Sequence, residues 1–128
     1  MQHNLQEYID KAAILVEALP YIQSFRGKTV VVKYGGSTLT TVARADTVLK
    51  DLVFMELVGI NPVIVHGGGS AIDRRLKERE IETKRVNGLR ITDHDTMQVV
   101  EDVLFGEVNA GLVEAIDALG GNAVGVSA

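Results

Sequence analysis

Residues 29–36 read TVVVKYGG, and residues 62–70 read PVIVHGGGS. Each run is a short series of apolar, mostly β-branched residues without polar alternation, which is typical of a strand buried on both faces. Each run then breaks into glycines at its carboxyl end. Two such strands predict one edge of an open α/β sheet, and this is the edge at which such folds bind ligands.

Two helices are predicted next to these strands. The first covers about residues 42–58 and is followed by Gly59 and Pro62, which are normal helix-stopping residues. The second covers about residues 71–80, with Ser70 as its N-cap. Strands that alternate with helices favour a mostly parallel sheet with right-handed crossovers.

The residues that follow predict a tight hairpin and then a long helix. Asn87-Gly88 lies between two short apolar runs and is the strongest short hairpin signal. Thr92 is expected to cap the long helix, which stops at Gly120-Gly121. Gly106 and Gly111 lie inside this helix, each at a cost of up to about 1 kcal/mol relative to alanine. They therefore predict close packing against another helix.

The two ends of the chain stand apart from this alternation. Residues 4–19 predict an amphipathic helix that Pro20 ends or kinks. This helix either lies back on its own domain or forms an arm that pairs with a neighbouring subunit. At the other end, residues 123–126 predict a third buried strand. No helix follows that strand, so the open sheet looks incomplete there.

The composition indicates a soluble globular domain. The 128 residues are the length of one domain, and the 46% hydrophobic content is that of an ordinary core. A net charge of -4 without a basic stripe argues against general nucleic-acid binding. The absence of cysteine excludes a disulfide framework and a thiolate metal site. The first residues lack the pattern of a signal peptide, and no apolar run approaches the roughly 20 residues of a membrane span, so we expect a cytoplasmic protein.

The glycine runs are the first candidates for a binding site. Gly67-Gly68-Gly69 lies between a strand and a helix N-terminus, where free N–H groups and the helix dipole favour an anion. Gly35 and Gly36 would let a ligand approach the backbone closely at the neighbouring strand end. The alternative for the triple glycine is a flexible turn. It is not a P-loop, and Ile72 stands where a dinucleotide-binding fingerprint needs its third glycine.

Two cations and a histidine complete the candidate site. Lys33 is either a fixed positive charge beside a phosphate or carboxylate, or a strand-end lysine that reaches solvent. Arg90 can clamp a carboxylate with two parallel bonds, although a surface salt bridge is the usual role of a lone arginine. His66 is expected to support the loop, because no other histidine lies at metal-ligand spacing from it. The sequence predicts a small anionic ligand and no metal ligands.

Three segments in this order resemble the N-terminal half of the amino acid kinase family, in particular its members that phosphorylate N-acetyl-L-glutamate. They are residues 33–36 (KYGG), residues 61–69 (NPVIVHGGG) and residues 87–93 (NGLRITD). Each segment alone is unspecific, whereas the ordered trio is specific, and the resemblance covers nearly the whole chain. Residues 14–23 (ILVEALPYIQ) resemble the extra N-terminal helix of the arginine-sensitive members, which interlaces dimers into a hexamer.

The resemblance implies a fold, a reaction and partners. The fold would be α/β, an open and mostly parallel sheet sandwiched by helices, with residues 1–24 as an interaction helix and residues 25–128 as the substrate-binding half. The reaction would transfer a phosphoryl group from ATP, with Mg²⁺, to the side-chain carboxylate of N-acetyl-L-glutamate in arginine biosynthesis. The partners would be that substrate, further copies of the chain in a dimer or hexamer, and the PII signalling protein bound by some members. Neither nucleic acid nor membrane is implied.

The resemblance also implies roles for individual residues. Lys33 matches the lysine that stabilises the transferring phosphoryl group. Gly68 and Gly69 match the backbone donors to the substrate, and Arg90 matches the arginine that holds its α-carboxylate. This chemistry is mostly charge neutralisation and positioning, and it needs no protein nucleophile.

The sequence departs from the family pattern in three respects. Ser37-Thr38 replaces the usual Asn-Ala, and Ser70 replaces the usual proline. Family members are also longer, and their nucleotide site, second catalytic lysine and organising aspartate lie in the half that is not represented here. One interpretation is a kinase, of which these 128 residues alone are expected to be inactive. The other is a truncated, non-catalytic module that binds an acyl amino acid or regulates.

Overall fold

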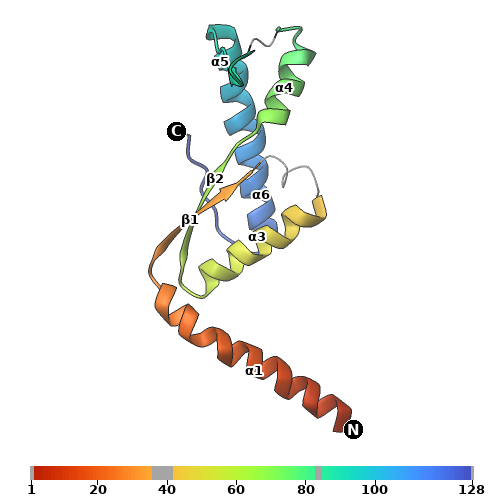
Figure 1. Cartoon of the computed structure of the whole chain (residues 1–128), viewed down its shortest axis with the longest axis vertical. Coiled ribbons are helices and arrows are strands. Elements are labelled where there is room, and N and C mark those ends of the chain that lie inside the picture. Colours follow the sequence, from red (N-terminus) through yellow and green to blue (C-terminus); the bar gives the residue numbers. More distant parts are fainter. Residues whose placement is uncertain (1, 36–41, 83–84, 128) are drawn as a thin grey trace.

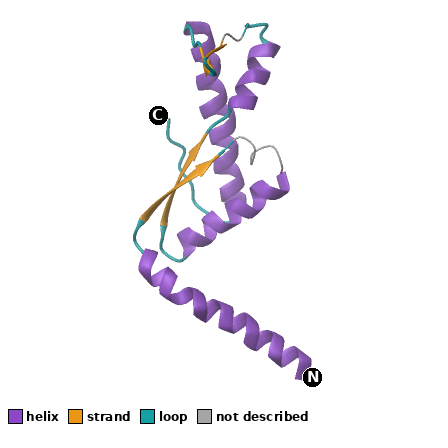
Figure 2. Cartoon of the chain, viewed as in Figure 1, coloured by secondary structure: helices purple, strands orange, loops and turns teal. Residues whose placement is uncertain are grey.

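The computed structural model describes residues 2–35, 42–82 and 85–127. Gly36, one of the glycines predicted after the first strand, lies outside the described residues. The described chain is an α/β structure in which helices flank a parallel strand pair and a long helix precedes it (Figures 1 and 2). The predicted fold class is confirmed. No helix within these ranges is long and apolar enough to cross a membrane.

The helices and strands follow one another along the chain as the βα pattern predicts. In order they are α1 (Gln2–Phe25), β1 (Thr29–Tyr34), α3 (Val42–Leu57), β2 (Asn61–His66), α4 (Gly69–Glu78), β3 (Arg85–Val86), β4 (Leu89–Arg90), α5 (His94–Glu101), η1 (Asp102–Asn109) and α6 (Ala110–Ala118). The η1 segment is π-helical. The predicted crossover helix between the first two strands is therefore present.

Helices α3 and α6 cover one face of the parallel pair formed by β1 and β2. One buried cluster on this face consists of Tyr34, Leu49, Leu52 and Leu112. The opposite face is open, since Val31 is 66% exposed and Val65 is 52% exposed. The prediction that both strands are buried on both faces is wrong for the described residues. The apolar sides of α3 and α6 pack on the same face of the pair.

A second core lies between α4 and the long helix that follows the hairpin. It consists of Ile72, Leu76, Val99 and Val103. The α5, η1 and α6 segments continue directly into one another, as the predicted long helix requires (Figure 1). Gly106 and Gly111 do not pack closely, because a Cβ added at either would meet nothing within 4 Å. The prediction of close helix packing at these two glycines is wrong.

The predicted hairpin forms. Strands β3 and β4 pair in antiparallel fashion, with Arg85 opposite Arg90. At the turn Asn87 has a φ of 51° and Gly88 a φ of 81°. Positive φ at both central residues is what a two-residue type I′ turn requires, and asparagine and glycine adopt it most easily.

Both predicted helix caps are wrong by one or two residues. Helix α5 is capped by Asp93 rather than Thr92, and the Asp93 carboxylate accepts a hydrogen bond from the N–H of Thr96 at 2.9 Å. Helix α4 has Gly68 at its N-cap rather than Ser70, and no side chain caps it. Aspartate is at least as good a cap as threonine, so neighbouring cap formers are hard to separate from sequence alone.

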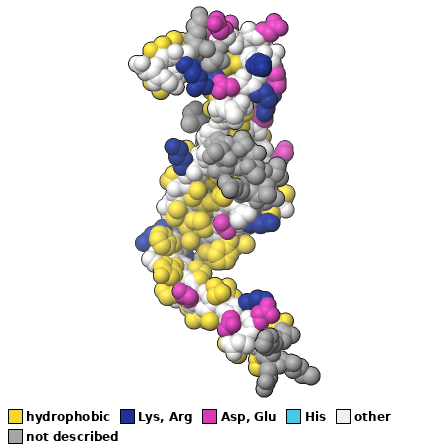
Figure 3. Space-filling model, turned by 45° about the vertical axis from the view of Figure 1, so that its right-hand side comes forward, with side chains coloured by type: hydrophobic (Ala, Val, Ile, Leu, Met, Phe, Trp, Pro, Cys, Tyr) yellow, Lys and Arg dark blue, Asp and Glu magenta, His cyan; other side chains and the backbone are white. Residues whose placement is uncertain are grey.

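Helix α1 extends away from the rest of the molecule (Figures 1 and 2). It continues through Pro20 to Phe25, so it does not end at the proline. A proline removes one backbone hydrogen bond, and the turns beyond it can still form. Leu5, Leu15 and Val16 are 65–68% exposed, and Figure 3 shows hydrophobic side chains on the surface of this lower part of the molecule. Within the described residues, α1 does not lie back on its own domain (Figure 1), which was one of the two interpretations of the sequence.

The predicted third strand at residues 123–126 does not form. Residues 121–127 have no regular secondary structure, and Val124 and Val126 are 84% and 76% exposed. The segment instead follows α6, where the N–H of Ala123 donates to the Asp117 carboxylate at 3.2 Å. A strand needs a neighbouring strand to satisfy its backbone groups, and this segment pairs with neither β1 nor β2.

Candidate functional site

The carboxyl ends of β1 and β2 lie side by side. Their register places Lys33 opposite Val65 and Tyr34 opposite His66, so both strands end at the same level. Gly35 and the triple glycine therefore follow at one edge of the pair, as the sequence predicts. In open α/β folds, the loops at this edge of the parallel sheet bind the ligand.

The triple glycine leads directly into α4. The Gly68 carbonyl accepts the first helical hydrogen bond from the N–H of Ile72 at 2.9 Å. Because no side chain caps this helix, its first N–H groups lack partners within it and carry the positive end of the helix dipole. A small anion is the ligand that such an end favours.

Gly68 also has a packing role that the sequence did not reveal. It is buried, and a Cβ at this position would lie 2.8 Å from Cδ2 of Leu104 and 3.2 Å from Cγ2 of Val108. Both side chains belong to η1, so the π-helical segment is pressed against the loop. A Cβ at Gly69 would meet nothing within 4 Å. Packing therefore requires a glycine at position 68 but not at position 69.

Lys33 lies on the open face of the strand pair. Its side chain is exposed, on the same side as Val31 and Val65. Within the described ranges Lys33 forms no ion pair, and no hydrogen bond joins it to Arg90. Lys33 is therefore accessible to solvent and lies next to the glycine edge.

Arg90 is held by an aspartate that sequence reasoning missed. Its side chain is only 13% exposed, and its Nη2 donates to Oδ1 of Asp73 in α4 at 2.6 Å. Arg85, on the opposite strand of the hairpin, donates to the same carboxylate at 3.0 and 3.1 Å but is 48% exposed. The other terminal nitrogen of Arg90, Nη1, is buried without a hydrogen-bond partner among the described residues. Nη2 of the Arg90 guanidinium therefore has a hydrogen-bond partner, whereas Nη1 has none among the described residues.

His66 supports the glycine loop, as expected from the sequence. Its Nδ1 lies 3.4 Å from the Gly67 carbonyl oxygen, and its Nε2 lies 3.1 Å from the side-chain nitrogen of Asn109 in η1. Asn109 was not among the sequence-derived candidates. Asn109 carries no distinct sequence signal, because Glu107 and Glu114 are also polar residues in the same helical stretch.

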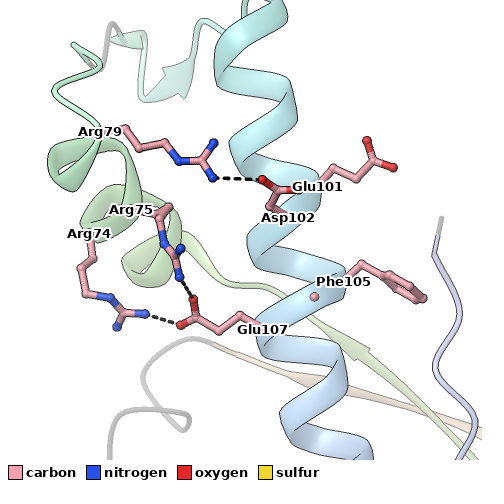
Figure 4. A pocket seen from close by; sticks show the side chains of 8 residues that line it. Arg74, Arg75, Arg79, Glu101, Asp102, Phe105 and Glu107 are labelled. Carbon is pink, nitrogen blue, oxygen red and sulfur yellow. Dashed lines mark hydrogen bonds and ion pairs between the residues drawn. The ribbon is translucent and has the colours of Figure 1, made fainter.

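A groove lined mostly by charged residues lies between α4 and the helix formed by α5 and η1 (Figure 4). It encloses about 790 Å³ and is lined on one side by Arg74, Arg75 and Arg79. Arg74 and Arg75 both pair with Glu107, and Arg79 pairs with Asp102 at 3.2 Å. Since each arginine already has a carboxylate partner, the groove is best explained as an ion-pair network that ties the two helices together.

The described residues do not provide a metal centre. No group of three or more histidine, aspartate or glutamate side chains among them could hold a metal ion. They therefore do not fit an Mg²⁺ ion held by the protein alone, and no chemical step is assigned to one.

Glycine loops at the carboxyl edge of a parallel βαβ unit, with a basic residue beside them, are typical of α/β proteins that bind small anionic ligands. Residues 28–128 match the family model described as the amino acid kinase family, and the chain belongs to that family. The resemblance noted in the sequence is confirmed.

Among its relatives are curated proteins named acetylglutamate kinase. The one from Carboxydothermus hydrogenoformans is 50% identical over 123 residues, which are 96% of this chain and 42% of that protein. The one from Caldanaerobacter subterraneus subsp. tengcongensis is 56% identical over 117 residues, 91% of this chain and 39% of that protein. The chain thus spans about two-fifths of the length of these relatives.

Solved structures support the same fold. A protein from Streptococcus mutans UA159 superimposes with a TM-score of 0.65 at 33% identity, over 72% of this chain and 37% of that one. The N-acetylglutamate synthase of Neisseria gonorrhoeae, complexed with coenzyme A and N-acetyl-glutamate, gives a TM-score of 0.62 at 24% identity, over 84% of this chain and 24% of that one.

Proposed function

We propose that this chain is the acceptor-binding part of an acetylglutamate kinase, which phosphorylates the side-chain carboxylate of N-acetyl-L-glutamate with ATP in arginine biosynthesis. Identity of 50–56% to proteins with that name over more than nine-tenths of the chain supports the proposal. The observation that carries it is the half-satisfied guanidinium of Arg90 beside α4, the helix that begins at the glycine loop.

The proposed acceptor site has two anchoring points. The first is the amino end of α4, where Gly68 and Gly69 would supply backbone donors. The second is Nη1 of Arg90, which is oriented by the pairing of Nη2 with Asp73. Asp73 comes four residues after Gly69, a rise of about 6 Å along the helix axis. This spacing suits a short dicarboxylate that binds Arg90 through its α-carboxylate and extends toward the loop.

Lys33 is the proposed stabiliser of the phosphoryl group in transfer. It lies at the same strand edge as the loop and has no competing ion pair among the described residues. A positive charge fixed there would neutralise charge that develops on the phosphoryl oxygens, which is the main requirement of this chemistry. Gly35 and Gly67 would leave room for backbone approach. We propose ATP and Mg²⁺ as the cofactors of the whole kinase on the basis of family membership.

We also propose that the protein is a homo-oligomer that assembles through α1. The exposed apolar side chains of that helix support an intermolecular partner. The proposal predicts that removal of residues 1–24 lowers the assembly state in analytical ultracentrifugation, and an unchanged state would reject it. The PII protein stays a prediction from the family resemblance.

Calorimetric titration of N-acetyl-L-glutamate into wild-type chain, Arg90→Ala and Arg85→Ala tests the acceptor site. Both arginines contact Asp73, but only Arg90 has a buried unsatisfied nitrogen. We expect Arg90→Ala to weaken binding by about 1.5–3 kcal/mol, the range for a hydrogen bond to a charged group. Arg85→Ala serves as the matched control and should change the affinity by less than about 1 kcal/mol, as for an exposed ion pair.

The ligand can be varied in the same experiment. The α-carboxamide analogue should bind wild-type chain more weakly than N-acetyl-L-glutamate and should bind Arg90→Ala about as well as the acid does. Equal effects of the two arginine substitutions would remove Arg90 from the site. No measurable binding of N-acetyl-L-glutamate to wild-type chain would reject the proposed function of the chain.

A further inference from the structure

We propose that Asn109 is a positioning residue that fixes the orientation of the glycine loop through His66. The inference rests on the proposed function, because it concerns the backbone donor that Gly68 would offer to the acceptor. Neither side chain needs to touch the ligand. The contact between the two side chains is partly buried, on the covered side of β2.

The hydrogen bonds fix the tautomer of His66. The Asn109 side-chain nitrogen lies 3.1 Å from Nε2 of His66. Because an amide nitrogen can only donate, a hydrogen bond between these two atoms requires a lone pair on Nε2. The proton of the neutral ring then lies on Nδ1, which faces the Gly67 carbonyl oxygen at 3.4 Å. Asn109 therefore holds the ring in the form that can donate to the loop.

The contact with Gly67 determines where the next N–H points. The peptide unit between Gly67 and Gly68 is planar and trans, so its C=O and N–H point in opposite directions. With the carbonyl turned toward His66, the N–H of Gly68 is turned away from the imidazole. Rotation of this one peptide plane would move a proposed substrate donor, and glycines on both sides offer little resistance to such rotation.

The position of Asn109 is itself constrained by two neighbours. It is the last residue of η1, the segment whose Leu104 and Val108 press on Gly68. On its other side a Cβ at Gly125 would collide with the Asn109 side-chain oxygen. The amide is thus confined between the end of β2 and the C-terminal segment. π-helical turns frequently occur at functional sites, where they redirect side chains.

Imidazole ¹⁵N NMR of the 128-residue chain tests the geometry without any ligand. We expect wild-type His66 to carry its proton on Nδ1 and Asn109→Leu to shift it toward the Nε2-protonated form. His94, which contacts Gln98 on α5, is the internal control and should keep its signals. An Nε2-protonated His66 in wild-type chain, or identical His66 signals in the variant, would overturn the proposal.

Binding of N-acetyl-L-glutamate then tests the consequence for the loop. Asn109→Leu should lower the affinity about tenfold at unchanged fold, measured by calorimetry with circular dichroism as the check. Asn122→Leu, at an exposed asparagine, is the matched control and should have no effect.

The outcomes separate this inference from the function on which it rests. Wild-type affinity in Asn109→Leu would overturn the positioning role alone. Absence of binding to wild-type chain would overturn the proposed function and this inference with it. Asn109→Ser, which is too short to reach Nε2, gives the same test if Asn109→Leu does not fold.

Discussion

The two faces of the β1–β2 pair differ, although they are built from the same two runs of sequence. One face carries Tyr34 and His66 and is covered by α3, α6 and η1. The other carries Lys33 and Val65 and is open. Alternate residues of one strand point to opposite faces, so neighbouring positions in the sequence have unrelated roles.

The glycine edge is therefore supported by packing on the covered face of the strand pair and accessible to solvent from the open face. The covered face supplies packing for the loop through Leu104, Val108 and Asn109. The open face supplies the charge of Lys33.

The largest effect is expected on the covered face. Tyr34 is 2% exposed within the first core, so Tyr34→Ala should lower the free energy of unfolding by about 3–5 kcal/mol. Val31→Ala, three residues earlier on the open face, should lower it by less than about 1 kcal/mol. Urea unfolding followed by circular dichroism measures both. Similar losses for the two variants would mean that the open face is covered in solution.

Lys33→Ala should separate activity from stability. The free energy of unfolding should change by less than about 0.5 kcal/mol, because the side chain is exposed. In a form of the protein that phosphorylates N-acetyl-L-glutamate, kcat should fall on the order of 10²–10³-fold with little change in KM. Steady-state kinetics would reject the proposed role if KM rose while kcat remained normal.

A smaller effect is expected within the glycine loop itself. Gly68→Ala places a methyl group against Leu104 and Val108, and overpacking of this kind costs about 1–3 kcal/mol. Gly69→Ala is the neighbouring control, and it should be neutral or slightly stabilising because nothing lies within 4 Å of the added Cβ. Thermal unfolding of the two variants would contradict this packing if both lost the same stability.

The βαβ unit and the hairpin could be predicted because their signals are local. A β-branched run that ends in glycine, or Asn87-Gly88 between apolar runs, specifies its own backbone geometry with little help from the rest of the chain. The third strand and the burial of both faces could not be predicted in the same way. Val124 and Val126 are suitable strand residues, but a strand forms only where a neighbour offers free backbone groups.

The residues of the candidate site also divide into those with a local sequence signal and those that depend on distant contacts. Lys33, Arg90 and the glycines stood out because their residue types are unusual where they occur. Asp73 and Asn109 did not, since an aspartate or asparagine on a helix is ordinary until the fold brings an arginine or a histidine to it. Their roles depend on contacts across 17 and 43 positions of sequence, which no local pattern encodes.

The joint between α1 and β1 determines where the far end of α1 can reach. Gly27, with a φ of 75°, donates to the Gly59 carbonyl at 2.6 Å, and the N–H of Asn61 donates to the Lys28 carbonyl at 2.9 Å. Helix α1 has 24 residues, a length of about 36 Å at 1.5 Å per residue. A rotation of about 10° at this joint would therefore displace the first turn of the helix by about 6 Å, given that length. The reach of α1 therefore depends on the geometry of a short turn, in which backbone hydrogen bonds join residues 27–28 to residues 59–61.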